Sequence, residues 1–229
     1  MVKVYTHIAI DGPAASGKTT VGRMVARRLN YLYLDTGAMY RALAFLALQS
    51  QTDLDNERAL LHLCDHHHIR VKLDLDAPIG YRIFAGDTDL TTQLTSSAVT
   101  AVVSTVAAHS LVRARLVEEQ RAIAAEGPVV MAGRDIGTVV LPDARYKIYL
   151  TASVQERVER RRAELQAAGV DIEPHELREE IEERDRLDET RLTSPLRPAS
   201  DATVIDSTGK TAAQVCDQIV GLVTAEARS

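Results

Sequence analysis

The chain has 229 residues, of which 45% are hydrophobic, and its formal net charge is −5. This length suits one large α/β domain with insertions, or one domain and a small satellite, and such a chain can bury a sizeable core. The negative balance gives no general positive field for nucleic acid, so an anionic substrate would need a locally basic pocket. The chain has no apolar stretch of about 18 residues, so we expect no transmembrane helix.

The amino-terminal apolar run is too short for a signal peptide. The two cysteines, Cys64 and Cys216, are far apart in the sequence and form no CxxC pattern. We therefore expect a cytoplasmic protein with reduced thiols and neither a membrane nor a nucleic-acid partner.

Strand and helix patterns alternate in the first part of the chain. A buried strand at residues 4–10 is followed by a glycine-rich loop and then by a helix at residues 18–29 with one apolar face. Further elements are expected as a strand at 31–34 and helices at 38–48 and 56–67.

Residues 69–90 differ in character from their surroundings. Short strands are expected at 69–75 and 81–85, with turn signals at Pro78-Ile79-Gly80 and Gly86-Asp87. This pattern predicts a small antiparallel insert.

The second half returns to alternating elements. Helices are expected at 97–108, 111–125, 154–167, 174–190 and 212–225, and strands at 129–132, 147–150 and 204–205. Such alternation predicts a parallel sheet with helices on both faces. The helices within 154–190 are rich in Arg and Glu, and by themselves these charges indicate only solvated helices with i,i+4 pairs.

The loop after the first strand matches the phosphate-binding pattern GxxxxGK[ST] without a mismatch. Its glycines allow a tight turn, and successive N–H groups at the following helix N-terminus can hold phosphate. The predicted nucleotide-binding residues are Gly12, Pro13, Ala14, Ala15, Ser16, Gly17, Lys18, Thr19 and Thr20. Lys18 would contact the β- and γ-phosphates, and the Thr19 hydroxyl would face Mg²⁺.

The rest of the sequence separates several classes of phosphate-loop protein. A GTPase would need an Asn-Lys-x-Asp segment to read guanine, and the sequence contains none. An ATPase motor usually has an apolar strand that ends in an acidic residue, whereas the strand at 129–132 leads into Gly133-Arg134-Asp135. These two exclusions still leave many kinds of phosphate-loop protein, among them a nucleotide-binding ATPase or regulatory module.

Several long blocks in the same order and spacing resemble bacterial cytidylate kinases, members of the nucleoside monophosphate kinase family of P-loop proteins. The blocks are IAIDGPAASGKTT, LDTGAMYRA, AGRDIGTVVLPDA with KIYL, and RDRLDETR with SPLRPASDA and VIDST. The resemblance implies transfer of the γ-phosphoryl group of ATP to CMP or dCMP, with Mg²⁺, by a monomer. Within the same class, shikimate or dephospho-CoA remains an alternative acceptor.

The resemblance also implies an architecture. It is a P-loop NTPase-type three-layer α/β fold with a five-stranded parallel sheet, a small antiparallel monophosphate-binding insert and a helical lid. Residues 1–229 would form one domain. Its core would cover 1–40, 98–153 and 192–229, the monophosphate-binding region about 41–97, and the lid about 154–191.

The resemblance implies a role for a residue only where that residue matches the family pattern. Arg41, Arg134 and Arg191 would hold the acceptor phosphate, because a guanidinium binds phosphate oxygens bidentately. Each could instead be a surface salt bridge. Asp188 and Arg184 match positions that contact ribose and phosphates. The implied catalytic set is Lys18, Arg134, Arg184, Asp188 and Arg191.

The remaining positions concern the base and the lid. Asp135, Ser104 and Arg113 would read cytosine, whose exocyclic amine donates to a carboxylate. Thr36 replaces a serine that is common in the family and keeps the hydroxyl. The lid arginines, Arg157 and Arg161, would close over ATP.

Two local features are a departure from the family pattern and a run of three histidines. Residues 109–113 lack the Pro-Arg often found just before the arginine that Arg113 matches. This departure puts a secondary contact of the family in question here, but not the role of Arg113. The run His66-His67-His68 is expected to be a solvated helix end, because adjacent histidines there do not converge on one ion.

Overall fold

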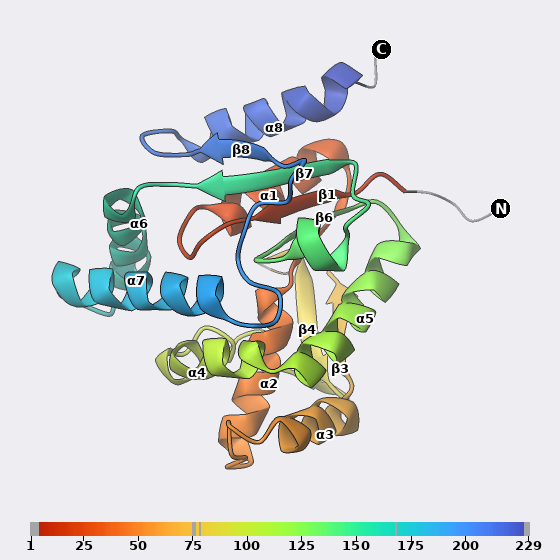
Figure 1. Cartoon of the computed structure of the whole chain (residues 1–229), viewed down its shortest axis with the longest axis vertical. Helices are drawn as coiled ribbons and strands as arrows, with labels where there is room; N and C mark the ends of the chain where they lie inside the picture. Colours follow the sequence, from red (N-terminus) through yellow and green to blue (C-terminus); the bar gives the residue numbers. More distant parts are fainter. Residues whose placement is uncertain (1–4, 75–76, 78, 168, 227–229) are drawn as a thin grey trace.

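The structure, a computed structural model, describes residues 5–226 except 75, 76, 78 and 168. Its centre is a five-stranded parallel sheet in the order β2-β6-β1-β7-β8 (Figure 1). The strands are β1 (Ile8–Asp11), β2 (Leu32–Asp35), β6 (Val129–Gly133), β7 (Tyr146–Thr151) and β8 (Thr203–Asp206). The expected α/β fold with a parallel sheet is therefore confirmed.

The central strands are the most apolar segments of the sheet. Every residue of β1 and of β6 is buried. Strands that are covered on both faces have such unbroken apolar runs. β1 pairs with β6 on one side and with β7 on the other, and Asp11 lies opposite Gly133 and Tyr149 at the carboxyl ends.

Eight helices accompany the two sheets in the described part of the chain. They are α1 (Lys18–Leu29), α2 (Gly37–Gln49), α3 (Glu57–His67), α4 (Ser97–Ala108), α5 (Ser110–Glu126), α6 (Val154–Ala167), α7 (Pro174–Thr190) and α8 (Ala212–Glu226). α1 packs against α8 and the sheet, and most buried apolar residues form one continuous core. The α6–α7 pair has a small apolar cluster of its own, and Figure 1 shows this pair at the carboxyl end of β7.

The expected antiparallel insert is present. β3 (Ile69–Leu73) pairs with β4 (Tyr81–Ala85), and β4 turns at Gly86-Asp87 into a third strand, β5 (Thr88–Asp89). This third strand is too short to show an alternating pattern, so the sequence did not predict it. Gly80 and Gly86 have positive φ values of 81° and 57°, as their turns require.

One short element was not predicted at all. Residues Ile136–Val140 form a single π-helical turn, η1, directly after Arg134 and Asp135. The Leu141 N–H donates to the Ile136 carbonyl at 2.7 Å, which closes this wider turn. Isolated π turns of this kind are frequent at functional sites.

Four expected positions lie outside the described residues: Val4 and Leu75 at strand ends, Pro78 in a turn and Ala168 in the α6–α7 connection. Cys64 and Cys216 are both free and buried. Within the described part, no single helix is long and apolar enough to cross a membrane. α4 and α5 pass that test only together, and they meet at an angle of 97°.

Candidate active site

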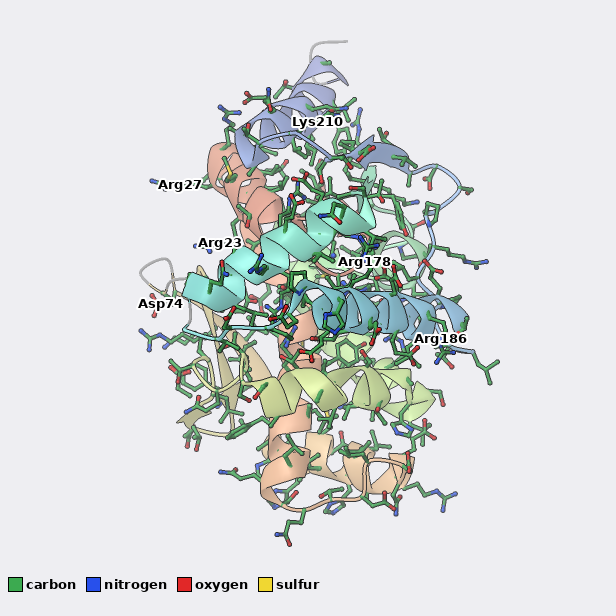
Figure 2. All side chains as sticks on the ribbon, turned by 90° about the vertical axis from the view of Figure 1, so that its left-hand side faces the viewer. Arg23, Arg27, Asp74, Arg178, Arg186 and Lys210 are labelled. Carbon is green, nitrogen blue, oxygen red and sulfur yellow. The ribbon has the colours of Figure 1, made fainter. Side chains whose placement is uncertain are left out.

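A cavity of about 770 Å³ lies where the carboxyl ends of β2 and β6 and the loop after β1 face the α6–α7 pair. Ligands of open α/β sheets bind at this edge, and the volume is typical of small-molecule sites. α4 and the antiparallel insert complete the wall. Figure 2 views the molecule from this side, with α6 and α7 in front and α4 below them.

The phosphate loop has the backbone that its glycines predict. Gly12 has φ +150°, and a Cβ there would lie 2.0 Å from the Leu150 carbonyl oxygen. Gly17 has φ +94° and occupies the N-cap position directly before α1. Lys18 is 8% exposed and donates from Nζ to the Pro13 carbonyl at 2.6 Å and to Ser16 Oγ at 3.3 Å. Burial, and then the charge of Arg134, lowers the pKa of Lys18 well below its usual value.

Thr19, which follows Lys18, is hydrogen-bonded to Asp35, an acidic residue that was not predicted from the sequence to belong to the site. Thr19 Oγ1 donates to Asp35 Oδ2 at 3.0 Å, and the Gly37 N–H donates to Asp35 Oδ1 at 3.0 Å. Asp35 ends β2, so its position at a strand's carboxyl end was the available signal. A hydroxyl and a carboxylate together match the oxygen ligands of Mg²⁺.

Four arginines and one aspartate predicted to bind phosphate line the same cavity: Arg41, Arg134, Arg184, Arg191 and Asp188. Asp188 accepts from Arg134 Nε at 2.7 Å, and Arg191 Nη1 lies 3.7 Å from its other oxygen. Burial raises the pKa of Asp188, but Arg134 and the other arginines outweigh burial and the net pKa is lowered.

Two of these arginines lack an acidic partner at salt-bridge distance among the described contacts. Arg41 donates to Thr100 Oγ1 at 3.2 Å. Burial, followed by the nearby charges of Arg134 and Arg41, lowers the pKa of Arg184 to about 10. Its Nε is buried without a hydrogen-bond partner among the described residues. Crowded guanidinium groups of this kind are stabilised by a bound polyanion.

The predicted base-reading residues form the next group along the cavity wall. Arg113 Nη2 donates to Asp135 Oδ2, and both side chains are at least 95% buried. Arg113 also lies over the Tyr40 ring, 5.2 Å from its centroid. Ser104 lines the cavity on α4. The structure thus brings Asp135, Arg113 and Ser104 to one cavity.

Thr36 is close to this group and fully engaged with the backbone. Its hydroxyl donates to the Ala132 carbonyl at 3.1 Å. A Cβ on Gly133 would lie 2.6 Å from Thr36 Oγ1 and 2.7 Å from the Ile136 side chain. Only glycine lets these two side chains close against the end of β6.

The arginines of α6 have different surroundings. Arg161 lines the cavity, whereas Arg157 is 4% exposed, pairs with Asp185 at 2.6 Å and donates to the Ala14 carbonyl at 3.2 Å. Arg160, which the sequence reasoning missed, donates to the Ser16 carbonyl at 3.4 Å and to Ser207 Oγ at 2.9 Å. These two arginines tie α6 to the phosphate loop.

Two other arginines of the α6–α7 pair, Arg178 and Arg186, do not line the cavity, whereas Glu164 and Glu180 do. Arg178 contacts Gln155 and Glu182, and Arg186 contacts Glu183; both are labelled in Figure 2. Within the described part of the chain, no group of three or more His, Cys, Asp or Glu side chains could hold a metal ion. This applies also to the histidine run at the end of α3. Within that helix His66 stacks on His62, with ring centroids 6.2 Å apart.

The site as a whole can place two anionic groups next to each other. The phosphate loop offers backbone N–H groups and Lys18 on one side, and the arginine cluster faces it from α2, α7 and the loop after β6. The neighbouring Asp135–Arg113 pair offers an acceptor and donors to an uncharged ring. This arrangement suits phosphoryl transfer between two phosphorylated molecules.

Comparisons with known proteins agree with this geometry. The profile of the family described as cytidylate kinase matches residues 8–225. A cytidylate kinase of Pelotomaculum thermopropionicum is 48% identical over 224 residues, which are 98% of both chains. One of Geobacillus thermodenitrificans is 50% identical over 216 residues, 94% of this chain and 95% of the relative.

A solved structure shows the same fold at much lower identity. It is an uncharacterized protein from Eubacterium ventriosum, 12% identical, with a TM-score of 0.55 over 97% of this chain and 99% of that one. At this identity the likeness concerns the fold alone. The family profile and the relatives that match over nearly the whole length show that this chain belongs to the cytidylate kinase family.

Proposed function

We propose that this chain transfers the γ-phosphoryl group of ATP to CMP or dCMP, giving ADP and CDP or dCDP. The observation that carries the proposal is the buried Asp135–Arg113 pair in the same cavity as Lys18 and the arginine cluster. The name shared by the relatives supports the same acceptor.

The residues would act by position and charge. The acceptor phosphate oxygen is already a nucleophile at neutral pH, so no general base is required. Arg41, Arg134 and Arg191 would hold that phosphate. Lys18 and the lid arginines would hold the charge that develops on the transferred group. Because burial keeps water away from these charges, their electrostatic effect would exceed that of the same groups in solvent.

ATP is proposed to arrive with Mg²⁺. Thr19 and Asp35 would provide the protein oxygens on the metal side, directly or through water, which fits the few protein ligands that Mg²⁺ usually takes in nucleotide sites. The ion would neutralise charge on the phosphates. The α6–α7 pair would close over ATP as a lid, and residues 41–97 would form the monophosphate-binding region. A monomer in the cytoplasm stays a prediction.

Asp135 is the proposed reader of the base. Cytosine has an exocyclic amine where uracil has an oxygen, so UMP would leave the carboxylate without a donor. An unpaired buried polar group costs about 1–3 kcal/mol, and a charged one more. CMP and dCMP should therefore react far better than UMP, and purine monophosphates hardly at all.

The proposal is tested by ADP formation from ATP with CMP, dCMP, UMP, AMP, shikimate or no acceptor. ADP release that needs CMP or dCMP supports it. Turnover without an acceptor would indicate an ATPase, and turnover with shikimate another small-molecule kinase. UMP used as well as CMP would replace the proposal with a general pyrimidine kinase.

The base-reading role has a separate test. Asp135→Asn should lower kcat/KM for CMP. It should also reduce the ratio of kcat/KM for CMP to kcat/KM for UMP, because an amide can present either a donor or an acceptor to the base. If the wild type prefers CMP and the variant keeps that preference unchanged, the activity stands and the role of Asp135 fails.

A further inference from the structure

We infer that Asp11 is a positioning residue for the acceptor-base site: it caps the η1 turn in place of Asp135 and thereby leaves the Asp135 carboxylate to Arg113 and the base. The inference rests on the proposed function. It concerns a residue outside the phosphate-loop pattern and outside the cavity wall.

Asp11 holds the backbone directly after the two acceptor-site residues. It ends β1, lies opposite Gly133 of β6 and is 3% exposed. Its Oδ1 accepts from the Ile136 N–H at 2.7 Å, and its Oδ2 accepts from the Gly137 N–H at 2.8 Å. Both carboxylate oxygens are therefore used on the first two residues of η1.

Asp135 occupies the position that would normally provide this cap. It immediately precedes η1, where an aspartate side chain commonly accepts from the N–H groups of the first turn. Here Asp135 makes no such bond, and its carboxylate pairs with Arg113 instead. One carboxylate cannot do both, and unsatisfied N–H groups in a buried turn would be unfavourable.

The surroundings of Asp11 favour a close fit. A Cβ on Gly137 would lie 3.3 Å from Asp11 Oδ2 and 3.3 Å from the Lys147 side chain. Glycine therefore allows the N–H to approach the carboxylate without displacing either neighbour. An ionised carboxylate suits two donors because both of its oxygens accept.

The experiment compares wild type, Asp11→Asn and Asn56→Ala. Asn keeps the volume of Asp11 but turns an NH₂ toward one backbone N–H, so η1 should loosen and Asp135 should shift. Asn56→Ala is the stability control. It removes the N-cap of α3, in which Asn56 accepts from the Ala59 N–H at 3.1 Å, and Asn56 does not line the cavity. Such caps contribute about 1 kcal/mol.

For Asp11→Asn we expect kcat/KM for CMP to fall about tenfold or more, since small displacements of positioned groups can reduce rate up to 10²-fold. KM for CMP should rise. Because kcat/KM for UMP should fall less than kcat/KM for CMP, the ratio of the two kcat/KM values should fall. Amide exchange at Ile136 and Gly137 should accelerate. Asn56→Ala should lower Tm with the ratio unchanged.

Equal losses for CMP and UMP in folded Asp11→Asn, with unchanged exchange at Ile136 and Gly137, would overturn the inference. If Asp11→Asn does not fold, Asp11→Ser is compared in the same way, because it also removes the buried charge. A wild type without preference for CMP defeats the proposed function, and the exchange data still decide whether Asp11 holds η1.

Discussion

The central sheet and the α6–α7 pair are stabilised in different ways. The sheet and its helices share one large apolar core, to which β1 and β6 contribute only buried residues. The α6–α7 pair buries just Val158, Leu177 and Ile181 in its own cluster. Its links to the phosphate loop are polar contacts of Arg157 and Arg160.

The difference separates stability from function. Apolar packing gives a scaffold that keeps the phosphate loop and strand ends in place without ligand. Polar contacts can be exchanged for contacts with a nucleotide at little net change in free energy. We therefore expect the segment that carries Arg161, Arg184 and Asp188 to move most readily. The first three predictions test this contrast, and the fourth concerns the end of β1 in the sheet.

The first prediction compares large-to-small substitutions in the two regions. Ile219, in α8, and Leu177, in α7, are both fully buried. Ile219→Ala should lower the global free energy of unfolding by about 2–5 kcal/mol, with activity per folded molecule unchanged. Leu177→Ala should lower it less and raise KM for ATP. Urea unfolding and initial rates measure both, and equal destabilisation would refute the contrast.

The second prediction concerns the boundary between the regions. Lys18→Ala should reduce kcat about 10²–10³-fold, by analogy with other charge-stabilising donors. Tm should change little for two reasons. The hydrogen bonds of Lys18 Nζ go to residues of its own loop, and burial already disfavours the charged form of the side chain. A variant with near-normal kcat would show that the phosphate loop does not serve this reaction.

The third prediction tests closure of the α6–α7 pair. ATP and CMP together, each at roughly 100 times its Kd, can stabilise a closed form by up to about 2.7 kcal/mol per ligand. Amide exchange in peptides covering 154–167 and 174–190 should slow, while peptides from α8 stay constant as the internal control. Exchange that is the same with and without ligands would contradict a moving lid.

The fourth prediction uses the ionisation of Asp11. Burial, with a smaller contribution from the charge of Asp135, raises the pKa of Asp11 to about 6. The two N–H bonds from η1 and the charge of Lys18 lower the pKa, but they do not cancel the effect of burial. The folded state therefore binds the proton more tightly than the unfolded state. Stability should increase by up to about 3 kcal/mol as the pH falls from 6 toward 4.

Activity should change in the opposite direction. A protonated Asp11 cannot accept from both N–H groups, so kcat/KM for CMP should fall about tenfold between pH 7 and pH 5. The ratio of wild type to Asp11→Asn cancels the titration of the substrate phosphate. A ratio that is constant across this range would show that ionisation of Asp11 does not matter to the site.

Local patterns account for most of what could be predicted. The glycines of the phosphate loop, the strand–helix alternation and the turn at Gly86-Asp87 all depend on neighbours in sequence, and the structure has them where expected. The grouping of Asp135, Arg113 and Ser104 came from the family resemblance instead. Neither pattern nor spacing would have selected a single helical serine.

The residues that were missed act across long sequence separations. Asp11 bonds to Ile136 at a separation of 125 residues, and Arg160 bonds to Ser16 at 144. Their side chains have no local signature, because an aspartate at a strand end and an arginine in a charged helix are both ordinary.

The phosphate loop, the fold class and the family could all be predicted from the amino-acid sequence, because they depend on short-range backbone preferences and on long matched blocks. The folded structure was needed to show that Asp11 caps η1 and that Asp135 pairs with Arg113. It was also needed to show that Arg157 pairs with Asp185 while Arg161 lines the cavity. The reason is physical: hydrogen-bond partners are chosen by proximity in space, and the parallel pairing of β1 with β6 is what brings Asp11 to the start of η1.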